Sequence, residues 1–491
     1  MKAAAAAAAV AALVAGCQTY RPAPLSAADN AQAIEARTLT DARLGAFLAA
    51  ARAADADAPA GAESDAPPAQ SRPVWDLSSL VLAALYYHPT LDQARAELAE
   101  ARAGVRTARQ IPNPSLGFED LAYTPHAAAG AAWTVAPLIN FLIETGGKRR
   151  ERTAGAQALL QAARADLVSA SWGVRGGVRD ALIELWAAQR RMELLGLRTA
   201  AQNELVAGLQ RQVEAGEAAG LELARERTTR NQLELASSDA QRAELAARSR
   251  LAASIGVPGS ALDRVNLDFT ALERDPPPFA PEGRAQLADR ALTGRSDVAA
   301  ALADYAAAES ALALEIARQY PDLTLSPGYS WDAGQHRYLL LPAVDLPIFN
   351  QNQGPIAEAR ARREQAAARF TALQAHIIQA IDGATAGYDA ASRSVTAARV
   401  LLDGEQERER RVDRLYRAGE IDHPTVLGTR LERMAADQAE FEAAVVQRQA
   451  LAALEDALQA ALLGPPLPAS NEQNPRVTNG PRRPAGITAS R

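Results

Sequence analysis

Four stretches of the chain alternate with the period of two that marks a β-strand, and the last of them is apolar on both faces because Leu339 and Leu341 lie between its alternating apolar residues. They lie at about 115–124, 131–143, 322–331 and 336–349. In the third stretch every second residue is apolar, at Leu323, Leu325, Pro327, Tyr329 and Trp331. The residues between them are polar or small, so one face of the strand is apolar and the other is not. The pattern predicts four amphipathic strands of the kind found in membrane barrels.

Between these strands the apolar residues recur at alternating intervals of three and four, which predicts long helices. The predicted helices span 77–109, with a break at 87–89, then 147–214, 221–254, 355–417 and 425–464. A further helix, with the matching break at 295–297, is predicted to end at 320–323. Many positions of this apolar seam are alanine, so the helices can pack closely, as in a coiled coil. The seam positions are Leu167, Ser171, Val174, Val178, Ala181, Leu185, Ala188, Met192 and Leu195 in one helix, and Phe370, Gln374, Ile377, Ile381, Ala384, Tyr388, Ala391, Val395, Ala398 and Leu402 in another. The helix at 147–214 alone would be roughly 100 Å long, far more than a globular domain needs.

Proline and glycine mark the places where the strands give way to the long helices. The last strand is predicted to run to Phe349, followed by a polar turn and by a proline in the first turn of a helix. The candidate residues for the turns between strands and helices are Pro137, Gly147, Pro347, Gly354 and Pro355.

The same unit of strands and helices occurs twice. The pairs of matching glycines are Gly147 and Gly354 (207 residues apart), Gly216 and Gly419 (203 apart), and Gly256 and Gly464 (208 apart). Such agreement indicates an internal duplication. The predicted organisation is a signal peptide at 1–16, an N-terminal lead at 17–74, repeat 1 at 75–264, a linker at 265–284, repeat 2 at 285–464 and a disordered tail at 465–491.

The number of strands predicts an oligomer. Four strands leave a sheet with two open edges, whereas a small membrane barrel needs about eight strands. Three copies of the chain would supply about twelve strands, which is enough to close a barrel.

The N-terminus predicts export from the cytoplasm. Its positive start and its apolar run are typical of a signal peptide and are too short for a membrane span. Residues 14–17 (VAGC) resemble a bacterial lipobox, which would make Cys17 the acylated first residue of the mature chain. Gln18 is not the aspartate that commonly retains lipoproteins in the inner membrane, so the outer membrane is expected. The alternative is an ordinary cleaved signal with an incidental cysteine.

Composition and charge exclude several classes of function. The net charge of −6 argues against a nucleic-acid partner. Five histidines and three methionines show no ligand spacing, so no metal site and no cofactor is predicted. The GGK sequence at 146–148 lacks the other residues of a phosphate-binding loop. No catalytic triad or paired-carboxylate arrangement is present, so the chain is not expected to be an enzyme.

Several motifs resemble the outer-membrane efflux proteins of the TolC type, over about residues 75–464. They are PNPSL at 112–116, PLIN…ETGGKR at 137–149 and LPIFNQNQGPIAEARARR at 346–363, and the last two are most similar to the CzcC-like branch, which serves heavy-metal exporters. The resemblance implies a mainly α-helical fold of duplicated strand and helix-hairpin units. It implies a homotrimer, with a 12-stranded barrel in the outer membrane of a Gram-negative bacterium and a long helical tunnel in the periplasm.

The implied function is that of a passive exit duct for heavy-metal cations or drugs. Its implied partners are a periplasmic adaptor protein, an inner-membrane pump of the RND type and the lipid of the outer membrane. The implied adaptor-docking residues lie at the hairpin tips: Gly216, Glu217, Gly220, Leu221, Glu222, Tyr416, Gly419, Glu420 and Asp422. Glycine there lets the chain reverse between antiparallel helices. The family's entrance aspartates match Thr425 and Gly428 in this chain, so the resemblance assigns no gating ring.

The main alternative is a periplasmic coiled-coil adaptor or scaffold lipoprotein. Adaptors have one helical hairpin flanked by small β domains, whereas this chain is predicted to have two hairpins, each entered from amphipathic strands. The two hairpins favour the channel.

Overall fold

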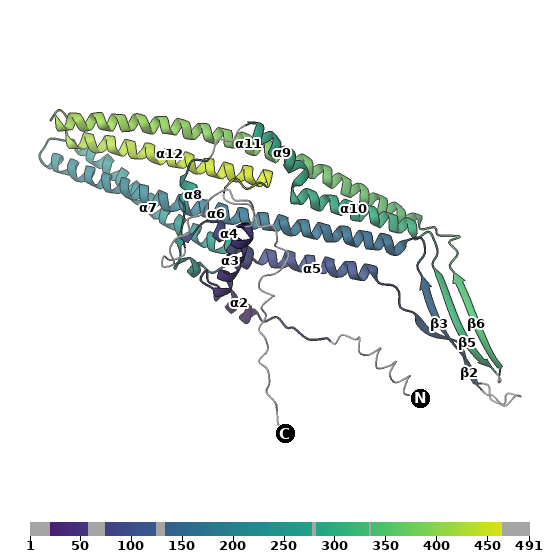
Figure 1. Ribbon diagram of the computed structural model, residues 1–491. Helices are drawn as coiled ribbons and strands as arrows, with labels where there is room; N and C mark the ends of the chain where they lie inside the picture. The colour runs from purple at the N-terminus through teal and green to yellow at the C-terminus, as the bar shows by residue number, and fades with distance from the viewer. Residues whose placement is uncertain (1–19, 57–73, 124–132, 277–280, 333–334, 464–491) are drawn as a thin grey trace, which may run out of the picture.

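The computed structural model of the chain describes residues 20–56, 74–123, 133–276, 281–332 and 335–463. Figure 1 shows a long molecule with a sheet at one end, the turns of two helical hairpins at the other end, and the short N-terminal helices beside the middle. The predicted signal peptide, Cys17 and the predicted tail lie outside the described residues.

Two units follow each other with the same order of elements, which confirms the predicted duplication. The first unit contains α4 (Leu77–Tyr87), α5 (Pro89–Arg109), β2 (Ser115–Tyr123), β3 (Trp133–Ile143), α6 (Lys148–Glu214) and α7 (Gly220–Ile255). The second unit contains α9 (Pro281–Gly294), α10 (Ser296–Ala317), β5 (Leu323–Asp332), β6 (Gln335–Val344), α11 (Gln353–Arg417) and α12 (His423–Leu458). The predicted break in the first helix lies at His88, just before Pro89 opens α5 at a position where its missing N–H is not needed.

Shorter elements gather around the middle of the molecule. They are α2 (Ala27–Glu35), α3 (Ala42–Ala56), β1 (Val74–Trp75), the 3₁₀ helix η1 (Gly259–Leu262), β4 (Asn266–Leu267) and α8 (Thr270–Glu273). β1 and β4 pair in parallel. Between α2 and α3, the Arg37 side chain donates hydrogen bonds to the backbone oxygens of Tyr87 (3.1 Å) and Gly256 (2.7 Å). These bonds hold the N-terminal segment against the first unit.

The long helices pack along an alanine-rich seam. α6 and α7 form one antiparallel hairpin, α11 and α12 form the other, and α12 also packs along α6. α10 contacts both α6 and α11, so it joins the two units between the middle of the molecule and the sheet. The seam positions predicted from the sequence are largely buried, among them Leu167, Val178, Leu185, Ile377, Ile381, Tyr388 and Val395. Met192, also predicted in the seam, is instead exposed.

The four longer strands form one antiparallel sheet in the order β2-β3-β5-β6. Strand register places most of the large apolar residues of the four strands on one face: Leu325 lies opposite Phe141 and Pro342, and Tyr329 lies opposite Tyr338. A register shift between Phe118 and Asp120 acts as a β-bulge. The bulge matters because Phe118 and Leu121 are an odd number of residues apart, and the extra residue keeps both on the apolar face.

The opposite face of the sheet is mixed: it carries polar side chains that hydrogen-bond to one another, together with Leu138, Leu142, Leu339 and Leu341. Asn140 accepts a bond from the Ser326 hydroxyl (2.6 Å) and donates one to Ser115 (3.2 Å). Near the loop end, Thr134 donates to Asp332 (3.1 Å). The apolar face is left open, and Leu116, Phe118, Leu121, Tyr123, Trp133, Tyr338 and Leu340 are each more than half exposed.

Two predicted element ends were wrong. The last strand stops at Val344 rather than Phe349, because the chain makes a tight turn around Pro347 in which the Ile348 amide bonds to the Leu346 oxygen (2.8 Å). The last helix stops at Leu458 rather than Gly464. There Gln459 takes the left-handed conformation (φ 46), and its side-chain oxygen accepts bonds from the amide and hydroxyl of Ser296.

Candidate functional site

Both hairpins turn at a glycine in the left-handed conformation. Gly216 and Gly419 each have φ of 78°. After each glycine, a backbone amide bonds to the carbonyl five residues earlier: Glu217 to Gln212 (2.8 Å) and Glu420 to Leu415 (3.0 Å). This is the Schellman arrangement, which satisfies the last carbonyls of α6 and α11. The predicted reversal at these two glycines is therefore correct, and both lie exposed at the end of the molecule.

The return helices start differently at the two tips. Asp422 caps α12, because its carboxylate accepts bonds from the amide and hydroxyl of Thr425. The bond from the Thr425 hydroxyl is the largest cause of the lowered pKa of Asp422. At the first tip the N-cap of α7 is Ala219, which has no side-chain oxygen to offer. The docking candidates Gly220, Leu221 and Glu222 follow it, all exposed.

We expect Asp422→Ala to loosen the second tip by about 1 kcal/mol, because the α12 amides lose their cap. Ala219→Asp should tighten the first tip by a similar amount. Hydrogen exchange at the first turn of each return helix measures both changes. Since the folded pKa of Asp422 is lowered, its contribution is present above the unfolded value of 3.8 and is lost as pH falls through the folded pKa. Equal exchange in the wild type and Asp422→Ala at neutral pH would contradict the capping role.

The two hairpins are joined just behind the tips. Leu427, which is fully buried, packs with a small apolar cluster from the first hairpin: Leu205, Val206, Leu209 and Leu223. His423 Nε2 lies 3.1 Å from a carboxylate oxygen of Glu204. The His423 ring also lies beside that of Tyr416, with centroids 5.7 Å apart. The structure thus brings Tyr416 to the joint between the hairpins, whereas sequence reasoning missed Glu204.

At the other end of the helices, a left-handed residue also opens each outgoing helix. Gly147 (φ 76) is the N-cap of α6, as predicted. In the second unit the corresponding residue is Asn352 (φ 63), whose side-chain amide donates to the backbone oxygen (2.7 Å) and carboxylate (2.9 Å) of Glu315. Gly354, which had been matched to Gly147, is already inside α11. Pro355 lies in the first turn of that helix, as predicted, and Pro137 lies within β3, opposite Phe118, rather than in a turn.

This correction is directly testable. We expect Gly147→Ala to destabilise the protein by roughly 1–2 kcal/mol, because an L-residue is strained at positive φ. Gly354→Ala should be neutral or slightly stabilising, because alanine favours a helix more than glycine does. Among the described residues, no atom lies within 4 Å of the added methyl group. Thermal unfolding of the two purified variants in detergent makes the comparison. The reverse order of stabilities would restore the original match of Gly147 to Gly354.

Ion pairs tie the two units together at the junction of sheet and helices. Lys148, at the start of α6, lies 2.7 Å from Asp322, just before β5. The same carboxylate accepts a bond from the Thr145 amide (2.9 Å). Arg152 pairs with Glu144 (2.6 Å) within the first unit. The second unit therefore fixes the direction in which the chain leaves β3 and enters α6.

A buried ionic cluster lies where the end of α12 meets the middle of α6, and sequence reasoning missed it. Arg175 and Arg179 are 2% and 1% exposed, and both pair with Glu455, which is fully buried. Arg179 also binds Asp456 (2.7 Å), and Arg175 donates to the backbone oxygen of Leu463 (2.5 Å). The cluster fastens the last turn of the second unit to the first unit.

Two further properties of the described residues bear on function. In the part of the chain that the structure describes, no three histidine, cysteine or acidic side chains lie close enough to hold a metal ion. Among the helices in these same ranges, none combines the length and the hydropathy that crossing a membrane would need.

The family model for "Outer membrane efflux protein" matches residues 80–257 and 287–459, which is more than half of the chain. The chain belongs to the outer membrane efflux protein family. Its predicted location in the outer membrane is thereby confirmed. Each matched segment starts in the first helix of its unit, α4 or α9, and ends one or two residues after its last helix, α12 or α7.

Two named proteins are similar in sequence to this efflux protein. The cobalt-zinc-cadmium resistance protein CzcC of Cupriavidus metallidurans is 29% identical over 290 residues, covering 57% of this chain and 65% of CzcC. The match therefore spans just under two thirds of that relative. The pyoverdine export outer membrane protein OpmQ of Pseudomonas aeruginosa is 26% identical over 379 residues, covering 74% of this chain and 77% of OpmQ.

Solved structures confirm the fold of this efflux protein. The outer membrane protein VceC of Vibrio cholerae superposes with a TM-score of 0.63 at 20% identity, covering 79% of this chain and 96% of VceC. The open state of the MtrE outer membrane channel of Neisseria gonorrhoeae superposes with a TM-score of 0.64 at 18% identity, covering 79% of this chain and 89% of MtrE. CusC superposes with a TM-score of 0.62 at 17% identity, covering 82% of this chain and 99% of CusC. The MtrE structure is described as that of an outer membrane channel, and the CusC structures are described as showing transmembrane channel formation.

Proposed function

We propose that three copies of this efflux protein form a passive exit duct from the periplasm through the outer membrane, without enzymatic activity. The sheet carries the main support. Its apolar face is exposed, the hydrogen-bonded polar side chains lie on its other face, and β2 and β6 each have a paired neighbour on one side only within the described sheet. Unpaired backbone groups are costly in hydrocarbon, so each edge needs a partner strand. Three copies closing edge to edge would satisfy both edges with about twelve strands.

The helical hairpins supply the periplasmic part of the proposed duct. α6 and α11 continue directly from the two halves of the sheet, so a closed barrel of three copies would open into a tunnel of helices. The tips lie farthest from the sheet, and we propose that Gly216, Gly419 and their exposed neighbours dock onto a periplasmic adaptor. An inner-membrane pump of the RND type would drive transport. Acylation of Cys17 would add a lipid anchor in the same membrane.

For the cargo we propose heavy-metal cations. The support is the similarity to CzcC, whose name states resistance to cobalt, zinc and cadmium. OpmQ, the second relative, is named for the export of an organic compound, so drugs and other organic molecules are the competing cargo. A coiled-coil adaptor or scaffold lipoprotein is not supported, because the chain has two hairpins and belongs to the channel family.

Two measurements test the proposal. Light scattering of the purified protein, with the detergent mass subtracted, should give the mass of three chains, and a monodisperse monomer would contradict the barrel. Deletion of the gene should lower the resistance of its host to zinc, cobalt, cadmium, copper or silver salts, and the wild-type gene should restore it. If resistance to a panel of drugs falls while metal resistance is unchanged, the metal assignment is wrong and the duct remains.

A further inference from the structure

A basic cavity lies at the junction between the sheet and the helices of the first unit. It has a volume of about 620 Å³, and we call it the junction pocket. Its walls come from the end of α5, the end of β3 and the first turns of α6. Four basic side chains line it, at Arg109, Lys148, Arg149 and Arg150, against one carboxylate, at Glu144.

The charges in the junction pocket are only partly neutralised. The carboxylate of Glu144 is paired with Arg152, so it does not neutralise the arginines of the pocket. Lys148 is paired with Asp322. Arg150, on the surface, pairs with its neighbour Glu151 (2.8 Å). Arg109 and Arg149 are exposed and have no ion pair with any residue in the described ranges. The pocket therefore carries a surplus of positive charge with guanidinium groups free to bind an anion.

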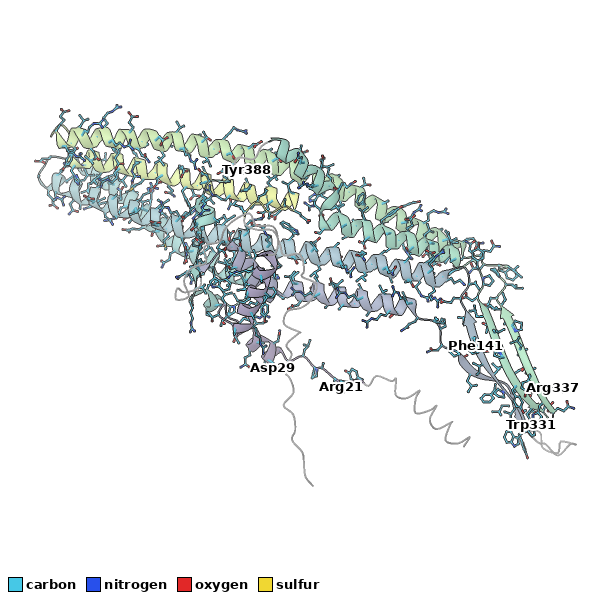
Figure 2. The ribbon with its side chains drawn as sticks, in the orientation of Figure 1. Arg21, Asp29, Phe141, Trp331, Arg337 and Tyr388 are labelled. Atoms are coloured by element: carbon cyan, nitrogen blue, oxygen red, sulfur yellow. The ribbon has the colours of Figure 1, made fainter. Side chains whose placement is uncertain are left out.

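The position of the junction pocket points to the membrane surface. The apolar face of β3 runs from Trp133 to Ile143, and Ile143 (44% exposed) lies on the rim of the pocket. Ile111 (66% exposed) lies on the same rim. Figure 2 shows Phe141 on the part of the sheet nearer the helices and Trp331 at the opposite end. The basic residues thus begin where the exposed apolar surface ends, on the helical side of the sheet.

We infer that the junction pocket binds the anionic headgroup of a phospholipid in the membrane leaflet that faces the periplasm. The inference rests on the proposed placement of the sheet across the outer membrane. Guanidinium groups bind phosphate through paired N–H donors, and basic pockets at a membrane surface hold anionic headgroups. The exposed Ile111 and Ile143 lie beside these charges and would contact the first carbons of the acyl chains, which a soluble anion lacks. The pocket volume also falls within the usual range for small-ligand sites.

The test is a lipid titration of the purified trimer. The wild type in detergent is titrated with phosphatidylglycerol, with phosphatidylcholine and with inorganic phosphate, and the rise in melting temperature is followed. We expect phosphatidylglycerol to stabilise the trimer in a saturable way and the other two to have little effect. The double variant Arg149→Gln/Arg150→Gln should need about thirtyfold more phosphatidylglycerol for half-saturation, because near a membrane surface each of the two arginines contributes roughly 1 kcal/mol.

Arg410→Gln/Arg411→Gln is the matched control, because this exposed pair lies on α11 near the tips, at the end of the molecule away from the sheet. It should titrate like the wild type. Equal half-saturation in both double variants, or equal stabilisation by phosphatidylcholine, overturns the lipid site. Stabilisation by phosphate alone would reduce the pocket to a simple anion site. If the double substitution at Arg149 and Arg150 prevents folding, the single variant Arg109→Gln and the comparison of the three ligands on the wild type still test the lipid site. A failed inference with an intact trimer leaves the proposed duct standing, whereas a monomer overturns the duct itself.

Discussion

Glu455→Ala is expected to abolish the stable protein, or to destabilise it by about 3–5 kcal/mol. Glu455 is fully buried and pairs with both Arg175 and Arg179, which are themselves almost completely buried. Its removal leaves two guanidinium groups away from water with less than their full set of partners. Asp456 would still reach Arg179, whereas the partners left to Arg175 among the described residues would be the backbone oxygen of Leu463 and the ring of Trp172.

Asp180→Asn is the matched control for this cluster. Asp180 also binds Arg179 (2.9 Å), but 58% of its side chain is exposed, so water can replace the lost charge. We expect its loss to change stability by less than about 1 kcal/mol. The measurements are the yield of trimer from the outer membrane and its thermal unfolding in detergent. Similar yields and melting temperatures for the two variants would show that the buried cluster does not hold the units together.

Gly419→Val is expected to reduce metal resistance to the level of the gene deletion while leaving the trimer in the membrane. The backbone at Gly419 has φ of 78°, so a β-branched residue would be strained by roughly 1–2 kcal/mol. No atom lies within 4 Å of an added Cβ, so there is no clash within the chain to add to this cost. The strain therefore falls on the turn that presents Tyr416, Glu420 and Asp422 to the proposed adaptor.

Gly419→Asn separates the shape of this turn from the loss of glycine itself. Asparagine tolerates the left-handed conformation, so this variant should keep most of the resistance. Resistance is compared with the amount of trimer in the outer membrane and with crosslinking to the adaptor. If resistance falls only in proportion to the trimer, the tip has a purely structural role and the docking assignment is wrong.

The order and type of the long elements could be predicted from the sequence because each carries its own periodic pattern. The errors arose at element ends, where tertiary contacts decide. A left-handed residue was expected to be glycine, but Asn352 takes that conformation through its bonds to Glu315, and Gln459 does so while its side chain caps Ser296. Once Gln459 replaces Gly464 as the partner of Gly256, the separation is 203 residues (459 − 256), the same as between the two tip glycines (419 − 216).

The candidate site was predictable only where the backbone itself sets the geometry. Gly216 and Gly419 could be found because a reversal between two helices favours glycine. The buried cluster could not be found in this way. Arg175 and Arg179 are four residues apart on a helix rich in arginine and glutamate, which is the usual pattern of a solvated surface. Only the return of α12 to the same place, 276 residues further on, removes Arg179 from water against Glu455.

The two hairpins have return helices of equal length but outgoing helices of different length. The return helices α7 and α12 each have 36 residues, but the outgoing helix α6 has 67 residues and α11 has 65. Two residues correspond to about 3 Å of rise and to about 200° of rotation around the helix axis. Measured from the start of each outgoing helix, the two tips of one chain therefore lie at different rises and face different directions. In a trimer they would alternate around the rim with true threefold symmetry and no sixfold symmetry. A partner that touches every tip must then either be present in three copies, each contacting both kinds of tip, or use the same surface to make two different contacts.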